Sequence, residues 1–158
     1  MDLLIYTDGA ARGNPGPSSS GFFILDSKEK LLAKKIFYNG ITTNNVAEYK
    51  AVIAALEYAS SMYGKESRIT LRSDSNLIVN QINGKFKVKN DALRSLHTKA
   101  KYAESKLASC KFINVPRENK YITLVDSELN KLLDKKERDG TTGTNENESN
   151  ESFQAKLG

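Results

Sequence analysis

The spacing of the apolar residues changes along the chain, and this change constrains the fold more than any other feature of the sequence. Strand-like runs come first, at residues 3–8, 21–25 and 31–38. From Tyr49 to Ala59 the apolar residues instead recur at helical spacing, and Thr43 and Asn44 precede them at positions suited to a helix cap. The chain is therefore expected to begin with strands and then to combine helices with strands.

The segments after this first helix follow the same logic. Further strands are expected at residues 68–73 and 111–115, and further helices at 75–82, 91–109 and about 122–138. Three consecutive strands with short links predict an antiparallel meander, whereas strands separated by helices need crossovers and so lie parallel. The expected fold is α/β, with a five-stranded mixed sheet flanked by helices.

Charge is distributed unevenly between one expected domain, residues 1–138, and a polar tail, residues 139–158. The domain carries 23 basic and 15 acidic side chains, an excess that favours a polyanionic partner. Residues 141–152 contain no apolar side chain, so we expect the tail to be disordered. A single cysteine, no signal segment and no membrane-length apolar run lead us to expect a cytoplasmic monomer with no membrane partner.

Three carboxylates stand at special places in this pattern. Asp8 comes at the expected end of the first strand, Glu48 in the expected first turn of the first helix, and Asp74 directly after the fourth strand. If the first and fourth strands are neighbours, these acids converge, and they repel one another unless a divalent cation joins them. Mg²⁺ or Mn²⁺ suits hard oxygen ligands, and two such ions suit phosphodiester hydrolysis. Taken singly, Glu48 is also explained by the helix dipole, and Asp8 by an incidental turn.

Four motifs occur together in one order. They are Tyr6-Thr7-Asp8-Gly9-Ala10-x-x-Gly13-Asn14-Pro15-Gly16, Thr43-Asn44-Asn45-x-Ala47-Glu48, Ser73-Asp74-Ser75 and Val115-Pro116-Arg117-Glu118-Asn119. In this combination residues 1–138 resemble type 1 ribonuclease H, in the compact form typical of archaea and some bacteria. The resemblance implies an endonuclease that cuts the RNA strand of RNA–DNA hybrids with two Mg²⁺ ions and leaves 5′-phosphate products.

The resemblance also implies roles for individual residues. The metal-binding and catalytic carboxylates are Asp8, Glu48, Asp74 and Asp126. Positions that face the minor groove of the hybrid are Gly9, Ala10, Asn14, Asn44, Asn45 and Asn76. Thr43 and Asn90 match positions that hold a DNA phosphate. Main-chain groups beside a glycine-rich turn suit contacts with 2′-hydroxyls, and asparagine suits the minor groove, where it discriminates little between sequences.

The loop before the last helix departs from the family pattern. The histidine that many relatives carry there is absent, and Arg117 occupies that region as a substrate contact. The spacing from Asn119 to Asp126 is longer than usual, which leaves Glu118 and Glu128 as rivals for the fourth carboxylate. Glu128 lies two residues beyond Asp126, roughly 200° around a helix, and should face elsewhere.

A basic segment offers a surface for a nucleic-acid backbone. Lys85, Lys87 and Lys89 alternate with less polar residues, so an extended segment would place the three ammonium groups on one side. The alternative is an ordinary solvated face. Two other functions compete with the one implied: a nuclease of the same fold that also cleaves double-stranded RNA, and a hybrid-binding module without catalysis.

Overall fold

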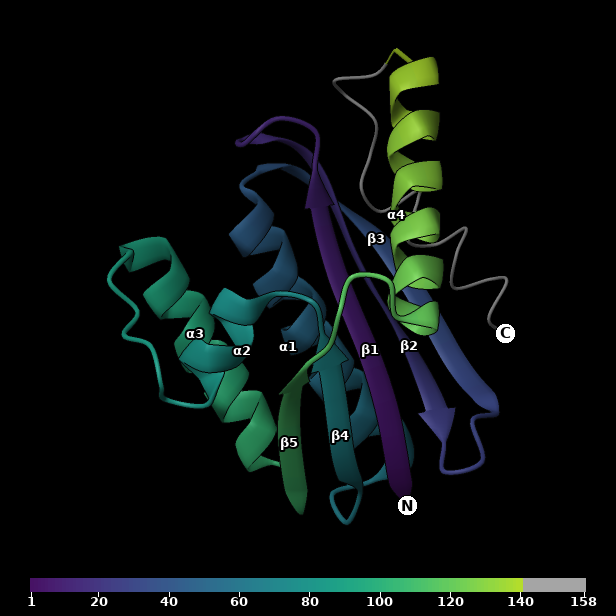
Figure 1. Cartoon of the computed structure of the whole chain (residues 1–158), viewed down its shortest axis with the longest axis vertical. Helices are drawn as coiled ribbons and strands as arrows, with labels where there is room; N and C mark the ends of the chain where they lie inside the picture. Colours follow the sequence, from purple (N-terminus) through teal and green to yellow (C-terminus); the bar gives the residue numbers. More distant parts are fainter. Residues whose placement is uncertain (141–158) are drawn as a thin grey trace.

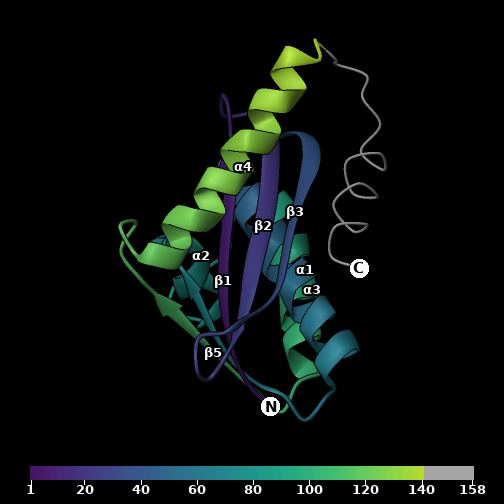
Figure 2. The ribbon, with the colours of Figure 1, turned by 90° about the vertical axis from the view of Figure 1, so that its right-hand side faces the viewer.

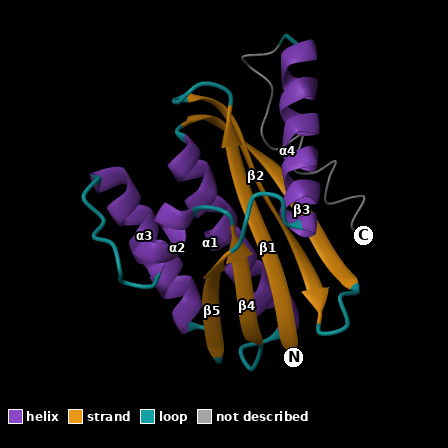
Figure 3. Ribbon diagram, viewed as in Figure 1, coloured by secondary structure: helices purple, strands orange, loops and turns teal. Residues whose placement is uncertain are grey.

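The sheet has five strands in the order β3-β2-β1-β4-β5. The computed structural model describes residues 1–140. Its elements are β1 (Asp2–Ala11), β2 (Gly16–Asp26), β3 (Leu31–Thr42), α1 (Asn44–Tyr63), β4 (Arg68–Ser73), α2 (Asn76–Ile82), α3 (Asp91–Ser105), β5 (Ser109–Asn114) and α4 (Lys120–Arg138). The first three strands are antiparallel, whereas β1–β4 and β4–β5 are parallel. This confirms the predicted mixed sheet (Figure 3).

Helices cover both faces of the sheet, so the core lies in two layers. On one face α1, α2 and α3 pack over side chains such as Leu3, Ile5 and Leu71. On the other face α4 packs over β1, β2 and β3, with Tyr6 and Leu129 in its core. Figure 1 shows α4 on the near side of the sheet, and Figure 2 shows α4 and α1 on opposite sides. Among residues 1–140 none of the helices combines the length and apolar character needed to cross a membrane.

The first strands are longer than the sequence pattern predicts. β1 continues to Ala11, and β2 begins at Gly16 because Ser18, Ser19 and Ser20 are buried strand residues. Each serine hydroxyl has a partner in another element: Ser18 with Thr42 at 2.6 Å, Ser19 with the Leu129 carbonyl at 3.2 Å, and Ser20 with the Ala47 carbonyl at 2.6 Å. These hydrogen bonds satisfy the buried hydroxyls and join β2 to β3, α4 and α1.

Two other predicted boundaries are wrong. The helix expected over residues 91–109 ends at Ser105, where the Lys106 and Leu107 amides close tight turns onto Ala103 and Glu104. β5 begins at Ser109 because it pairs with Arg68 of β4. The segment with the three lysines is not uniformly extended: it bends where the Lys85 and Phe86 amides both donate to the Asn80 carbonyl. The tail was expected to be disordered, and its residues beyond Gly140 lie outside the described part of the chain.

Candidate active site

Asp8 lies where β1 outruns its parallel neighbour. The predicted strand end at Asp8 is wrong, because β1 continues for three further residues opposite β2, with Asp8 facing Gly21. The parallel pairing with β4, however, stops at Tyr6 and Arg72. Asp8 therefore lies just beyond the carboxyl end of β4, in the position that sheets of this kind use for ligands. Asp8 is 5% exposed, and its Oδ1 accepts from the Gly9 amide at 3.0 Å.

Glu48 projects from α1 towards the same point. It is the fifth residue of the helix, so it lies in the second turn and not in the first turn that the sequence predicts. Thr43 caps the helix through its hydroxyl, which accepts from the Val46 amide, and Asn44 is the first helical residue. A Cβ added at Gly9 would lie 2.4 Å from the Ala47 carbonyl carbon, so only glycine permits this approach of β1 to α1.

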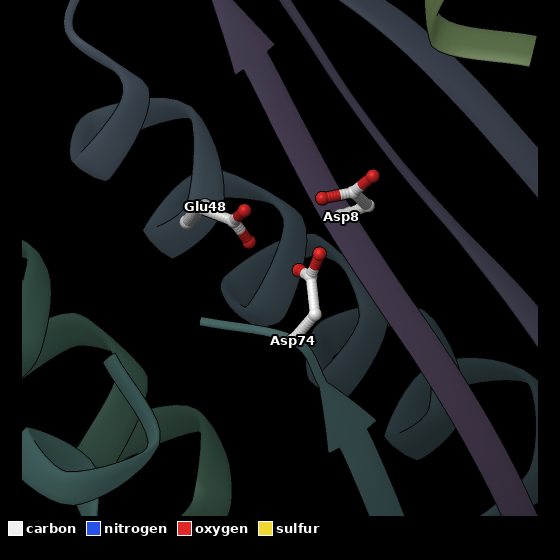
Figure 4. A group of neighbouring side chains, drawn as sticks. All are labelled: Asp8, Glu48 and Asp74. Carbon is white, nitrogen blue, oxygen red and sulfur yellow. The ribbon is translucent and has the colours of Figure 1, made fainter. Parts of the chain in front are cut away.

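Asp74 completes the group from the end of β4. It lies between Ser73, the last residue of that strand, and Ser75, whose hydroxyl caps α2 by accepting from the Ile78 amide. One carboxylate oxygen from each of Asp8, Glu48 and Asp74 lies within 4.8 Å of the others. Figure 4 shows the three side chains pointing towards one another from β1, α1 and the end of β4. The predicted convergence of these three acids is present in the structure.

The electrostatics of the group disfavour three free carboxylates. Burial, followed by repulsion from Asp74, raises the pKa of Asp8 from 3.8 to about 7. Burial and then the charge of Asp8 raise the pKa of Glu48 well above its ordinary value. The pKa of Asp74 is also raised, chiefly by burial, while the positive charge of Arg117 opposes this rise. Glu48 Oε2 is buried and accepts no hydrogen bond from the described residues. A buried acceptor beside two further acids fits a divalent cation, whose charge would offset the repulsion.

Asp126 faces the same cavity from α4. The cavity has a volume of about 430 Å³ and is lined by Asp8, Gly9, Ala10, Ala11, Arg12, Asn44, Glu48, Asp74, Arg117, Asp126, Asn130 and Leu133. The charge of Asp126 contributes to the raised pKa values of Asp8 and Asp74. Asp126 is not one of the three acids that lie within 4.8 Å of one another.

The rival acids do not line this cavity. Asn119 caps α4 through its Oδ1, which accepts from the Tyr121 and Ile122 amides, so the residues that lengthen the spacing form the first turn of the helix. Glu118 is exposed in the loop. Glu128 contacts Lys34 of β3 at 3.3 Å, on a different side of α4 from Asp126, as its position around the helix predicts.

The predicted substrate contacts divide into two groups. Gly9, Ala10, Asn44 and Arg117 line the cavity itself. Asn14 is tied to this group, because its Oδ1 accepts from the Asn44 amide at 3.0 Å. The other predicted contacts are not part of the cavity lining. Thr43 and Asn45 are half-buried, and the exposed residues are Asn76, Asn90, Lys85, Lys87 and Lys89. Asn90 caps α3, since its Oδ1 accepts from the Leu93 amide, so its position is also explained by the helix that it begins.

The predicted site residues did not include Arg12 and Asn130, which both line the cavity. Arg12, at the β1–β2 hairpin, donates from Nη2 to both the carbonyl and the side-chain oxygen of Asn130, at 3.3 and 3.2 Å. The same guanidinium forms ion pairs with Asp134 at 2.6 Å and Glu137 at 3.2 Å. The hydrogen bond to Asp134 is the largest contribution to the raised pKa of Arg12. The four-residue spacing of Asp126, Asn130 and Asp134 places all three on one side of α4, and this spacing is a sequence signal for Asn130 but not for Arg12.

Comparison with known proteins assigns the fold to a family. Residues 6–123 match the family model described as reverse transcriptase-like. The chain is 34% identical over 135 residues to the bifunctional protein Rv2228c of Mycobacterium tuberculosis, covering 85% of this chain and 36% of that protein. It is 37% identical over 112 residues to ribonuclease HI of Halobacterium salinarum, covering 71% of this chain and 55% of that protein. The chain thus spans between about a third and a half of these relatives.

Solved structures agree over nearly their whole length. RNase H1 from Halobacterium salinarum superposes with a TM-score of 0.80 at 32% identity, covering 85% of this chain and 99% of that one. LC11-RNase H1 in complex with an RNA/DNA hybrid superposes with a TM-score of 0.74 at 39% identity, covering 83% of this chain and 99% of that one. The chain belongs to the reverse transcriptase-like family, as a ribonuclease H-like domain.

Proposed function

We propose that residues 1–138 form a catalytic domain that hydrolyses the RNA strand of RNA–DNA hybrids. The observation that carries this proposal is the buried group of Asp8, Glu48 and Asp74, whose ligand oxygens lie within 4.8 Å of one another. Its position at the carboxyl end of β4, inside a ribonuclease H-like fold, favours nuclease chemistry over a role in folding stability. A hybrid-binding module without catalysis would not need three acids that repel one another.

The carboxylates would hold two Mg²⁺ ions, with Mn²⁺ as a substitute. Asp8, Glu48 and Asp74 are the proposed ligands, together with Asp126, whose side chain lines the same cavity. Bound there, the ions would activate a water molecule and stabilise the leaving oxygen, which becomes the ribose 3′-hydroxyl when the 5′-phosphate product forms. The protein's own contribution is to keep the four acids together and to exclude most solvent from Asp8 and Glu48, which are 5% and 8% exposed.

Residues of the cavity lining and residues outside it would together contact a hybrid. We assign the minor-groove contacts to Gly9, Ala10, Asn14, Asn44, Asn45 and Asn76. Main-chain amides near the hairpin suit recognition of the 2′-hydroxyls that distinguish RNA from DNA. Thr43 and Asn90 are assigned to a DNA phosphate. Arg117, Lys85, Lys87 and Lys89 are assigned to the phosphate backbone of the hybrid, because their positive charges can neutralise its phosphates.

A cleavage assay on three duplexes tests the proposed function. Labelled RNA–DNA, RNA–RNA and DNA–DNA duplexes of one sequence are incubated with the protein in Mg²⁺ and, separately, in EDTA. Cleavage of the RNA strand of the hybrid, dependent on Mg²⁺ and lost in Asp8→Asn, is the expected result. Cleavage of RNA–RNA as well would extend the substrate range to double-stranded RNA. Tight hybrid binding without any cleavage would replace the proposed enzyme with a binding module.

A second assay identifies the fourth carboxylate. Asp126→Asn, Glu118→Gln and Glu128→Gln are compared at several Mg²⁺ concentrations, so that weakened metal binding is separated from a lost catalytic group. Asp126→Asn is expected to lose most activity, while the other two variants stay near the parent rate. Near-normal cleavage by Asp126→Asn with a crippled Glu118→Gln would transfer the role to Glu118.

A further inference from the structure

Arg12 joins the tip of the β1–β2 hairpin to α4. It follows the last residue of β1, and its guanidinium reaches three residues on successive turns of α4: Asn130, Asp134 and Glu137. Asn130 extends the connection, since its Nδ2 donates to the carbonyl of Asp126 at 3.0 Å. A continuous chain of hydrogen bonds therefore runs from the hairpin to the backbone of the proposed fourth carboxylate.

The same hairpin is joined to α1 on its other side. The Ala11 amide donates to Asn44 Oδ1 at 2.9 Å, and the Asn44 amide donates to Asn14 Oδ1 at 3.0 Å. The hairpin thus lies between the helix that carries Glu48 and the helix that carries Asp126. It also carries Gly9 and Ala10, which line the cavity.

The charges around Arg12 argue against a direct contact with substrate phosphate. An arginine that binds phosphate presents free N–H groups to it. Here both terminal nitrogens already face carboxylates, at 2.6 Å for Asp134 and 3.2 Å for Glu137. The two acids are 53% and 67% exposed, so these ion pairs contribute little to folding stability. What they do fix is geometry, because one planar guanidinium contacts three residues of a single helix.

We propose that Arg12 is a positioning residue that holds the β1–β2 hairpin against α4. It would thereby keep Asp126 in register with the other carboxylates and keep the hairpin main chain in place for the hybrid. In terms of catalysis, Arg12 can have this role only if the proposed ribonuclease activity is correct. The positioning itself is testable without any substrate.

The test compares Arg12→Leu, Arg12→Lys, Asp134→Asn and the double variant Arg12→Leu/Asp134→Asn. Two controls remove other contacts: Arg68→Leu breaks the 2.6 Å ion pair with Asp2 at the opposite end of β1, and Lys34→Leu breaks a contact between β3 and α4. Hydrogen exchange of the Ala11 and Asn44 amides is measured first, in EDTA. Both amides are expected to exchange about tenfold faster in Arg12→Leu than in either control.

Steady-state cleavage and hybrid binding give the second readout. Arg12→Leu is expected to raise the KM for the hybrid and the half-saturating Mg²⁺ concentration by about tenfold, while kcat at saturation falls less than about threefold. Its affinity for a labelled hybrid in EDTA should fall in parallel. Loss of folded protein alone would lower kcat and leave KM unchanged. Arg12→Lys should recover only part of the effect, and the double variant should be no worse than the poorer single variant.

Different results overturn different statements. Parent-like exchange of the two amides in Arg12→Leu would refute the positioning role, whatever the chain cleaves. Additive effects of Arg12→Leu and Asp134→Asn on KM would also refute it, because Arg12 would then contact the substrate directly. Failure of the parent chain to cleave or bind hybrids would refute the proposed function, while the exchange measurement would still decide whether Arg12 holds the hairpin.

Discussion

Replacing Asp8 with asparagine should stabilise the metal-free protein while it abolishes cleavage. Asparagine has nearly the same shape and no charge, so it removes the repulsion and leaves the packing unchanged. The pKa of Asp8 is raised from 3.8 to about 7, with burial as the main cause and Asp74 as the next. A shift of that size corresponds to a penalty of about 4 kcal/mol for the ionised form in the folded state. We expect Asp8→Asn to recover roughly 2–4 kcal/mol of this, because the amide must still be solvated or hydrogen-bonded.

The sign of the pH dependence follows from the direction of the shift. Below about pH 4 Asp8 is protonated in both the folded and the unfolded state, and its titration costs nothing. As the pH rises towards 7, the unfolded chain releases this proton while the folded protein retains it. The free energy of unfolding of the parent protein therefore falls over this interval, and the penalty stays constant at higher pH. Asp8→Asn lacks this contribution, so its advantage appears only as the pH rises.

Urea denaturation in EDTA at pH 5 and pH 8 measures the effect. Asp8→Asn should exceed the parent in stability at pH 8 by more than at pH 5. Glu57→Gln, which removes an exposed acid from α1, is the matched control and should follow the parent at both values. In Mg²⁺ the stability advantage of Asp8→Asn over the parent is expected to shrink or to reverse, because ion binding stabilises the parent. An Asp8→Asn protein that is folded but no more stable than the parent at pH 8 in EDTA would refute the argument from repulsion. Retention of more than a few per cent of parental cleavage would refute the assignment of Asp8 as a catalytic carboxylate.

Three further predictions concern Gly9, the three lysines and the tail. Gly9→Ala should cost about 1–3 kcal/mol in urea denaturation and weaken Mn²⁺ binding measured by calorimetry, since its Cβ would lie 2.5 Å from the Glu48 amide; unchanged values would contradict the close approach. Changing all three lysines of the bent segment to alanine should weaken hybrid binding for every sequence alike and flatten its dependence on salt, and an unchanged slope would exclude a backbone contact by Lys85, Lys87 and Lys89. A chain that ends at Arg138 should cleave within about twofold of the 158-residue chain, because the last buried side chain of α4 is that of Lys136; a large loss of rate or of melting temperature would assign a role to the tail.

Local sequence patterns were sufficient for the order of the elements and for three acids of the site. Strand alternation and helical spacing arise within a few residues, so they identify β1 and α1 without any knowledge of the fold. Asp8 and Asp74 could be placed together because parallel neighbours end at one edge of the sheet. The sequence left both Thr43 and Asn44 as candidate caps, and because Thr43 is the cap, Glu48 is the fifth residue of α1 and lies just beyond its first turn.

Contacts between distant residues were not predictable in the same way. Ser18, Ser19 and Ser20 look like loop residues, and they are strand residues only because partners in β3, α4 and α1 satisfy their hydroxyls. The contact of Arg12 with Asn130 spans 118 positions in the sequence, and no local pattern marks it. Alternation around Lys87 suggested an extended segment, whereas the Asn80 carbonyl bends the chain at Lys85 and Phe86.

The sheet order has a consequence for how the protein folds. β1 is the first strand in the sequence and the central one in space, and its parallel partner β4 begins only at Arg68. The antiparallel strands can form from residues 2–42, but the acids of the site come together only after long loops have closed. We therefore expect the repulsion among them to arise late in folding, after the transition state. We accordingly expect Mg²⁺ to slow unfolding in stopped-flow experiments and to leave the folding rate nearly unchanged, so that the bound ion prolongs the lifetime of the native state without guiding its formation.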